Sequence, residues 1–273
     1  MIKAIAVDKD GTFFKSDNTF DEAYFNKIFE SMMERDIKFI IASGNQYAQL
    51  RSFFSGKDHQ ITYIAENGAV TYQNNKLEAA EYFDQQLVFD VLNLIINHYH
   101  IEDIVLSGVK SAYVLEDVSN DFLSFLNKYY FNITKVSDFK NIEQDEFVKI
   151  ALRIKDTLLL DEVMKGLKAQ YGEEIKPVTS GNDSLDLILP KVNKGVAIKT
   201  LLDKWEIQPQ ELLAFGDANN DIEMLALTPY SYAMAECSPG VADVANYRAP
   251  SNDESGVLQV IERYLKQDND TTN

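Results

Sequence analysis

Short apolar runs alternate with helical segments along this chain, and this alternation restricts it to few folds. Four of the runs read as buried strands, at residues 2–7, 37–42, 61–65 and 212–215. Apolar side chains recur at helical spacing between or after them, at residues 21–35, 46–54, 196–205 and 257–265. Strands that alternate with helices predict a parallel sheet with right-handed crossovers. We therefore expect an α/β fold with a Rossmann-like parallel-sheet core.

The middle of the chain has a different pattern. After about Tyr82, helical runs at 87–98, 121–129 and 157–171 are interspersed with short strands at 104–109, 112–116, 147–154 and 184–189. This pattern is typical of an antiparallel α+β sheet. We therefore predict a catalytic core of residues 1–82 and 188–273 and an inserted α+β domain of residues 83–187. Strand 147–154 alternates apolar and polar residues, so one covered sheet face is expected, with Lys149 and Arg153 on the exposed face.

Charge and composition exclude several classes of partner. The 273 residues carry a formal net charge of −17, which disfavours binding to nucleic acids and to anionic membranes. No apolar stretch approaches the ~18 residues of a membrane span, and the first apolar run is too short for a signal peptide. A single cysteine, Cys237, cannot form an internal disulfide. We expect a soluble, cytoplasmic protein that is a monomer or a weak dimer.

Polar residues follow the predicted core strands at the points where they end. Asp8 and Asp10 follow the first strand, Ser43 the second and Asp217 a late one, while Lys194 precedes the helix that leads into that late strand. Open α/β sheets bind ligands at the carboxyl ends of their strands. Carboxylates, a hydroxyl group and a lysine are therefore expected to converge on one edge of the sheet.

The same residues resemble the four motifs of the haloacid dehalogenase superfamily. Asp8-Lys9-Asp10-Gly11-Thr12 is similar to motif I, Ser43 to motif II, Lys194 to motif III, and residues 216–221 (Gly-Asp-Ala-Asn-Asn-Asp) to motif IV. Residues 66–69 (Glu-Asn-Gly-Ala) are similar to a sequence typical of the Cof-type branch. About 150 residues separate Ser43 from Lys194. The resemblance therefore implies the class with a large α+β cap between motifs II and III, as in Cof-type phosphatases.

This resemblance implies a role for each motif residue. Asp8 would be the nucleophile that forms an aspartyl-phosphate, and Asp10 the general acid and base. Mg²⁺ would be held by the Asp8 carboxylate, the Asp10 backbone carbonyl and Asp217, because oxygen ligands favour this ion. Lys194 would hold the phosphoryl group, and Asp221 would orient Lys194 or a metal-bound water. The remaining phosphate-binding candidates are Lys9, Gly11, Thr12, Ser43, Gly44 and Asn220.

The expected function is hydrolysis of a small phosphorylated metabolite that depends on Mg²⁺. The inserted segment offers few cations for a second anionic group, which favours a sugar phosphate, while its aromatic residues leave FMN or pyridoxal phosphate as the alternative. A phosphohexomutase of the same superfamily and a non-catalytic phosphometabolite-binding regulator are the rival functions. Two positions depart from the family pattern, Lys9 and Asn45. Candidate substrate contacts in the inserted segment are Lys110, Lys149, Arg153, Asn182 and Asp183.

Overall fold

The computed structural model describes residues 1–179 and 183–270, and this part of the chain forms two compact units. The first unit contains Met1–Gly44, Phe54–Lys76 and Asn193–Asn273, and the second contains Asn45–Phe53 and Leu77–Val192. The predicted insertion at 83–187 lies inside the second unit, which also takes up nine residues just after Ser43. Candidate residue Asn182 lies outside the described residues.

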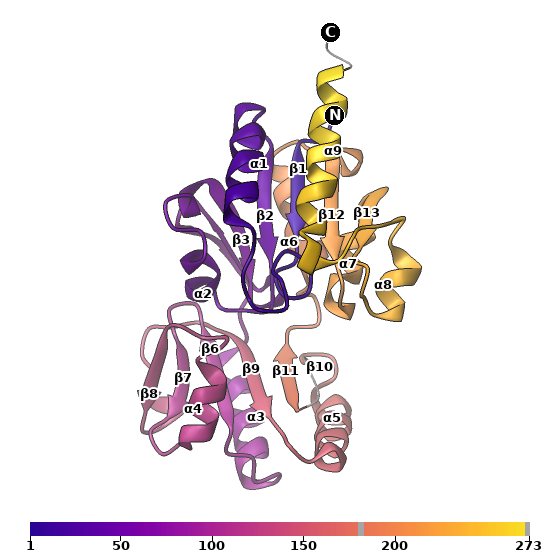
Figure 1. The fold of residues 1–273 in the computed structure, drawn as a ribbon. Coiled ribbons are helices and arrows are strands. Elements are labelled where there is room, and N and C mark those ends of the chain that lie inside the picture. The colour runs from indigo at the N-terminus through magenta and orange to yellow at the C-terminus, as the bar shows by residue number, and fades with distance from the viewer. Residues whose placement is uncertain (180–182, 271–273) are drawn as a thin grey trace. The chain divides into compact units, whose positions relative to one another are not determined.

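The first unit is built on the strands of an eight-stranded sheet with the order β14-β13-β12-β1-β2-β3-β4-β5, whose edge strand β5 starts at Lys76, the last residue of this segment of the unit. Figure 1 shows its central strands, from β13 to β3. The strands from β14 to β3 are parallel, and β4 runs antiparallel to β3. Their bounds are β1 (Ala4–Val7), β2 (Lys38–Ala42), β3 (Ile61–Ala65), β4 (Val70–Gln73), β5 (Lys76–Ala80), β12 (Leu212–Gly216), β13 (Tyr230–Ala233) and β14 (Tyr247–Arg248). The predicted α/β class with a parallel sheet is confirmed.

Helices cover both faces of this sheet: α1 (Glu22–Glu34), α6 (Lys194–Lys204), α7 (Ile222–Leu225), α8 (Pro239–Val244) and α9 (Gly256–Asp270). One face packs small and aliphatic strand residues against α6, α7 and α8. The other is aromatic, since Phe13, Phe25, Phe39 and Phe54 pack with ring centroids 5.3–6.0 Å apart. Asp21 caps α1 by accepting a hydrogen bond from the Tyr24 amide.

The second unit has a six-stranded sheet with the order β10-β11-β9-β6-β7-β8. All its strand pairs are antiparallel except β7 with β8. The strands are β6 (Ile104–Gly108), β7 (Ala112–Leu115), β8 (Ile133–Val136), β9 (Phe147–Arg153), β10 (Lys176–Thr179) and β11 (Ser184–Ile188), and the helices are α2 (Tyr47–Ser52), α3 (Gln85–Asn97), α4 (Asn120–Leu126) and α5 (Thr157–Tyr171). One face packs against α3 and α5. Short 3₁₀ turns occur in both units, at Asp58–Gln60, Glu66–Gly68, Phe139–Asn141, Pro209–Glu211, Asn219–Asp221 and Asn252–Glu254.

The expectation of one covered face for β9 is wrong. Its second face is also buried, because α4 and Tyr130 pack there against Val105, Val114 and Ala151. Lys149, expected on an exposed face, is only 3% exposed. Among the described helices, none is both long and apolar enough to cross a membrane.

Candidate active site

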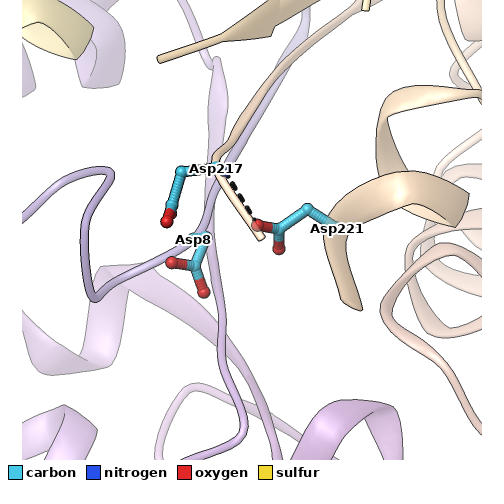
Figure 2. A group of neighbouring side chains, drawn as sticks. All are labelled: Asp8, Asp217 and Asp221. Atoms are coloured by element: carbon cyan, nitrogen blue, oxygen red, sulfur yellow. Dashed lines mark hydrogen bonds between the residues drawn. The ribbon is translucent and has the colours of Figure 1, made fainter. Parts of the chain in front are cut away.

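Strand register brings three aspartates together at the carboxyl edge of the first unit's sheet. Asp8 follows β1, and its amide donates to the Phe215 carbonyl of the neighbouring β12 at 3.1 Å. Gly216 ends β12, so Asp217 follows it directly, and Asp221 closes the next 3₁₀ turn. One carboxylate oxygen from each of Asp8, Asp217 and Asp221 lies within 4.8 Å of the others (Figure 2). The parallel pairing of β1 with β12 therefore produces the acidic cluster.

Lys194, the first residue of α6, neutralises part of this cluster. Its Nζ donates to Asp8 Oδ1 at 2.5 Å and to Asp221 Oδ1 at 2.6 Å, and its side chain is fully buried. Burial opposes the charged form, but Asp221 and Asp8 outweigh it and raise the pKa of Lys194 above its usual range. Lys194 is therefore a permanent cation beside the Asp8 carboxylate.

Two carboxylates of the cluster, in contrast, have raised pKa values that favour the uncharged form. Burial, resisted by Lys194 and reinforced by Asp221 and Asp217, raises the pKa of Asp8 well above its ordinary value. Burial also raises the pKa of Asp217 to about 6, although a hydrogen bond from Thr12 opposes this shift. Three carboxylates face one ammonium group, so the cluster lacks positive charge when all are ionised. A divalent cation would supply it, and oxygen donors of this kind suit Mg²⁺.

Loop contacts fix the positions of these carboxylates. The Thr12 hydroxyl donates to Asp217 Oδ1 at 2.6 Å, and the backbone amides of Asp217 and Ala218 donate to Asp221 Oδ2 at 3.0 Å each. Gly11 has a φ of +80°, and a Cβ there would lie 2.6 Å from Asp217 Oδ2. The motif I loop thus requires glycine at this position so that it can approach the Asp217 carboxylate.

Asp10 and Lys9 form a pair beside the cluster. The Asp10 side chain is 49% exposed, and its carboxylate contacts the Lys9 ammonium group. Lys9 itself is buried, with Nζ 4.8 Å from the centre of the Phe14 ring. The buried Lys9 side chain thus directs its charge to Asp10. The Asp10 carboxylate is not one of the three that converge in the acidic cluster.

The other phosphate-binding candidates lie at the ends of neighbouring elements of the same unit. Ser43 follows β2 and is buried, with its amide bonded to the Ile64 carbonyl at 2.9 Å. Its own carbonyl accepts from the Asn67 amide at 3.0 Å. The Asn67 side chain accepts from Asn220 Nδ2 at 3.1 Å and lies so close to Gly44 that a Cβ there would be 3.0 Å from Asn67 Oδ1. Asn67 therefore links the Ser43–Gly44 segment to Asn220.

Comparisons with known proteins agree with this geometry. The family described as haloacid dehalogenase-like hydrolase matches residues 5–261. The chain belongs to this family. It is 36% identical to the 5-amino-6-(5-phospho-D-ribitylamino)uracil phosphatase YbjI of Escherichia coli, over 98% of this chain and 97% of that protein. The Bacillus subtilis phosphatase YitU, named for the same substrate, is 22% identical over 96% and 97% of the two chains.

A solved structure extends the comparison. The crystal structure of SMU.1108c from Streptococcus mutans superposes with a TM-score of 0.89 at 36% identity, covering 97% of this chain and all of that one. The predicted Cof-type family, its fold and the enzyme class of phosphatase are therefore confirmed.

Proposed function

We propose that this phosphatase hydrolyses phosphomonoesters of small, hydroxyl-rich metabolites through an aspartyl-phosphate on Asp8. The observation that carries the proposal is the position of the Asp8 carboxylate. It is buried at the end of β1, 2.5 Å from the Lys194 ammonium group and beside two further aspartates. A buried carboxylate next to a fixed cation suits a nucleophile that must meet an anionic phosphoryl group.

The chain's own residues would divide the reaction between them. An Asp8 oxygen attacks phosphorus, and the bond to the leaving oxygen breaks. Asp10 donates its proton to that oxygen and then takes one from the water that hydrolyses the aspartyl-phosphate. Lys194, with Ser43 and the backbone amides of the Lys9–Thr12 loop, stabilises the charge on the transferring group. Asp221 holds the Lys194 ammonium group in place, and Asn67 holds the Asn220 side chain.

Mg²⁺ is the proposed cofactor. Asp8 and Asp217 would hold it together with the Asp10 backbone carbonyl, and when bound it would neutralise the repulsion between the phosphate and the carboxylates. When Asp8, Asp217 and Asp221 are all ionised, Lys194 balances one of their three negative charges. One divalent cation would balance the remaining two.

The substrate class follows from two lines of support. The chain has a net charge of −17, so a leaving group with further anionic groups would be repelled. Two of its relatives are named for 5-amino-6-(5-phospho-D-ribitylamino)uracil, whose leaving group is a neutral ribityl chain attached to a pyrimidine. We therefore place this compound first among candidate sugar and polyol phosphates, and the second unit is the proposed cap that selects it.

A phosphate-release panel tests the proposal. The purified protein is assayed with Mg²⁺ or with EDTA against 5-amino-6-(5-phospho-D-ribitylamino)uracil, hexose and pentose phosphates, FMN, pyridoxal phosphate and nucleoside triphosphates. We expect release that requires Mg²⁺, with the highest kcat/KM for a neutral polyol or sugar leaving group. A preference for nucleoside triphosphates would contradict the leaving-group argument. Absence of release from every ester by folded protein would contradict the hydrolase itself.

A further inference from the structure

Thr12 is a buried residue of the motif I loop whose side chain contacts a carboxylate from a distant part of the chain. Only 1% of the residue is exposed. Its hydroxyl group donates to Asp217 Oδ1 at 2.6 Å, across 205 positions of sequence. This length is typical of a hydrogen bond from a hydroxyl group to an ionised carboxylate, which is roughly twice as strong as one between neutral groups. The bond therefore ties the loop after β1 firmly to the residue after β12.

The backbone of the loop is fixed on both sides of Thr12. Gly11, just before it, has a φ of +80° and approaches so closely that a Cβ there would lie 2.6 Å from Asp217 Oδ2. Phe13, just after it, donates its amide to the Asp8 carbonyl at 3.2 Å. The position of the Thr12 hydroxyl is thus set by its neighbours as well as by Asp217.

The backbone of Asp217 is held independently of Thr12. Its amide donates to Asp221 Oδ2 at 3.0 Å, and its carbonyl accepts from the Ser238 amide at 2.7 Å. Within residues 1–179 and 183–270, Thr12 makes the only hydrogen bond to the Asp217 carboxylate. What Thr12 fixes is therefore the rotation of this carboxylate about its side-chain bonds.

Hydrogen bonds divide the oxygens of the acidic cluster into two kinds. Both Asp221 oxygens are engaged, Oδ1 with Lys194 and Oδ2 with two backbone amides. Asp8 uses Oδ1 for Lys194, and Asp217 uses Oδ1 for Thr12. In the described part of the chain, the Oδ2 atoms of Asp8 and Asp217 accept no hydrogen bond. Figure 2 shows these side chains, which are the two proposed to hold Mg²⁺.

The bond to Asp217 also bears on the phosphate-binding role expected for Thr12. A threonine hydroxyl carries one hydrogen and can therefore donate one hydrogen bond. In this structure that hydrogen is directed to Asp217. The lone pairs that remain on the hydroxyl oxygen cannot donate to an anionic phosphoryl group. Orienting Asp217 and donating to phosphate are therefore mutually exclusive roles for this side chain.

We propose that Thr12 is a positioning residue for Mg²⁺, whose hydroxyl group holds the Asp217 carboxylate in the orientation that binds the ion. The proposal rests on the proposed function and deepens its Mg²⁺ site. Carboxylates that bind metals are themselves held by hydrogen bonds, and loss of such a partner typically lowers metal affinity about tenfold to a hundredfold. Thr12→Val keeps the shape of the side chain but removes the donor, so Asp217 can rotate away from its binding orientation.

Mg²⁺ titrations of the full chain test the proposal without requiring turnover. The dissociation constant of Mg²⁺ is measured by calorimetry at constant ionic strength, with no phosphate ester present, for the unaltered protein, Thr12→Val and Thr12→Ser. We expect Thr12→Val to weaken Mg²⁺ binding about tenfold to a hundredfold, and Thr12→Ser, which keeps the hydroxyl group, less than about threefold. If Thr12→Val does not fold, Thr12→Ala removes the hydroxyl group with a smaller side chain and is measured in the same way.

Thr228 offers a matched control in the same unit. It is also buried, and its hydroxyl group donates at 2.6 Å to the carbonyl of Leu212, the first residue of β12. Asp217 follows the opposite end of this strand. Thr228→Val therefore removes a buried hydroxyl donor away from the acidic cluster. It should lower the thermal midpoint but leave the dissociation constant of Mg²⁺ unchanged.

Steady-state kinetics separate the metal role from a phosphate role. With Mg²⁺ saturating each protein, the KM of Thr12→Val for phenyl phosphate should differ from that of the unaltered protein by less than about threefold. At low Mg²⁺ its activity should fall much further than that of the unaltered protein. A phosphate-binding Thr12 would give the reverse result, a raised KM at saturating Mg²⁺ with unchanged Mg²⁺ binding in the absence of ester.

Unchanged or tighter Mg²⁺ binding in Thr12→Val, or equal weakening in Thr12→Val and Thr228→Val, would overturn the proposal. The proposed function is judged separately by phosphate release from the unaltered protein. Mg²⁺ binding that depends on Thr12, without release from any ester, would retain the positioning role and reject the hydrolase. Release that requires Mg²⁺, with full Mg²⁺ affinity in Thr12→Val, would do the opposite. Absence of Mg²⁺ binding by the unaltered protein would reject both this role and the proposed cofactor.

Discussion

Lys194 is a fully buried lysine whose ammonium group lies between two buried carboxylates, 2.5 and 2.6 Å away. Removing its charge leaves Asp8 and Asp221 without their counter-ion in a poorly solvated place. We expect Lys194→Met to lower the free energy of unfolding by about 3–5 kcal/mol. Urea denaturation without added metal measures this change.

Lys199 provides a matched control in the same helix. It is 61% exposed and pairs with Asp203 one turn away. Because exposed ion pairs contribute little, Lys199→Met should change the free energy of unfolding by less than about 1 kcal/mol. Equal effects of the two substitutions would show that the buried pairings of Lys194 do not stabilise the fold.

Asp8→Asn tests the nucleophile directly. The amide keeps the shape of the carboxylate but cannot form the aspartyl-phosphate, so phosphate release should fall by about 10⁴-fold or more. The fold should persist, because Lys194 keeps its bond to Asp221. The measurement is phosphate release under saturating substrate, with circular dichroism as the check on folding. Full activity in the folded variant would assign the nucleophile to another residue.

The positions of site residues could be predicted from the sequence only for residues that directly follow a core strand. Asp8 and Asp217 follow adjacent parallel strands, so their proximity follows from the βα pattern. The bond between Asn67 and Asn220 joins residues 153 positions apart, and no local pattern encodes it. The exposed face predicted for Lys149 is wrong because alternation reveals which residues share a face, not what covers that face.

At the scale of elements, the turn after β3 makes close contact with the start of α6. Gly68 has a φ of +108°, and a Cβ there would lie 2.4 Å from the Asn193 carbonyl oxygen. Asn193 caps α6 by accepting from the Val196 amide, and Lys194 follows it. The glycine therefore allows this turn to pack against the helix end that presents Lys194.

Gly68→Ala should lower both stability and activity. Gly56→Ala is the control that separates the cost of a positive φ from the cost of the steric clash with Asn193. Gly56 also has a positive φ, +82°, but a Cβ added to it would meet no described atom within 4 Å. Gly56→Ala should therefore cost only the about 1–2 kcal/mol of a left-handed conformation, and Gly68→Ala about 1–3 kcal/mol more because of the steric clash. Denaturant unfolding and kcat measure the two effects. Similar losses in both variants would argue against the close contact with Asn193.

Elements marked by a clear apolar run or by helical periodicity could be predicted, and weakly marked edge elements could not. The predicted bounds of β3 and α5 match the structure, because uniform apolar runs or long helical periodicity mark them clearly. The sequence patterns do not indicate the strands β8, β10 and β14 or the helix α8. These elements have four, four, two and six residues, and each of the strands lies at a sheet edge and has no fully buried residue. Their formation depends on the neighbouring strand more than on their own sequence.

For the whole molecule, a net charge of −17 means that any added cation screens repulsion and raises stability somewhat. Specific binding of Mg²⁺ must therefore be distinguished from screening. The acidic cluster allows specific binding to be told apart from screening. Asp8, Asp217 and Asp221 converge within 4.8 Å, and Lys194 balances one of their three charges. A bound divalent ion relieves local repulsion that monovalent salt reaches poorly, since the cluster is largely buried.

We therefore expect Mg²⁺ at 10 mM to raise the thermal midpoint above that in KCl of equal ionic strength. If the dissociation constant is about 0.1 mM, the gain is about 2.7 kcal/mol, or several degrees for a chain of this size. Asp217→Asn should abolish the extra stabilisation by Mg²⁺ while keeping the response to KCl, because it removes one proposed metal ligand and leaves the global charge almost unchanged. Asp203→Asn, an exposed carboxylate on α6, is the control and should keep the full extra stabilisation. If the higher midpoint in Mg²⁺ than in KCl persists in Asp217→Asn, the ion binds elsewhere. Identical midpoints in the two salts would show that Mg²⁺ stabilises the fold by screening alone.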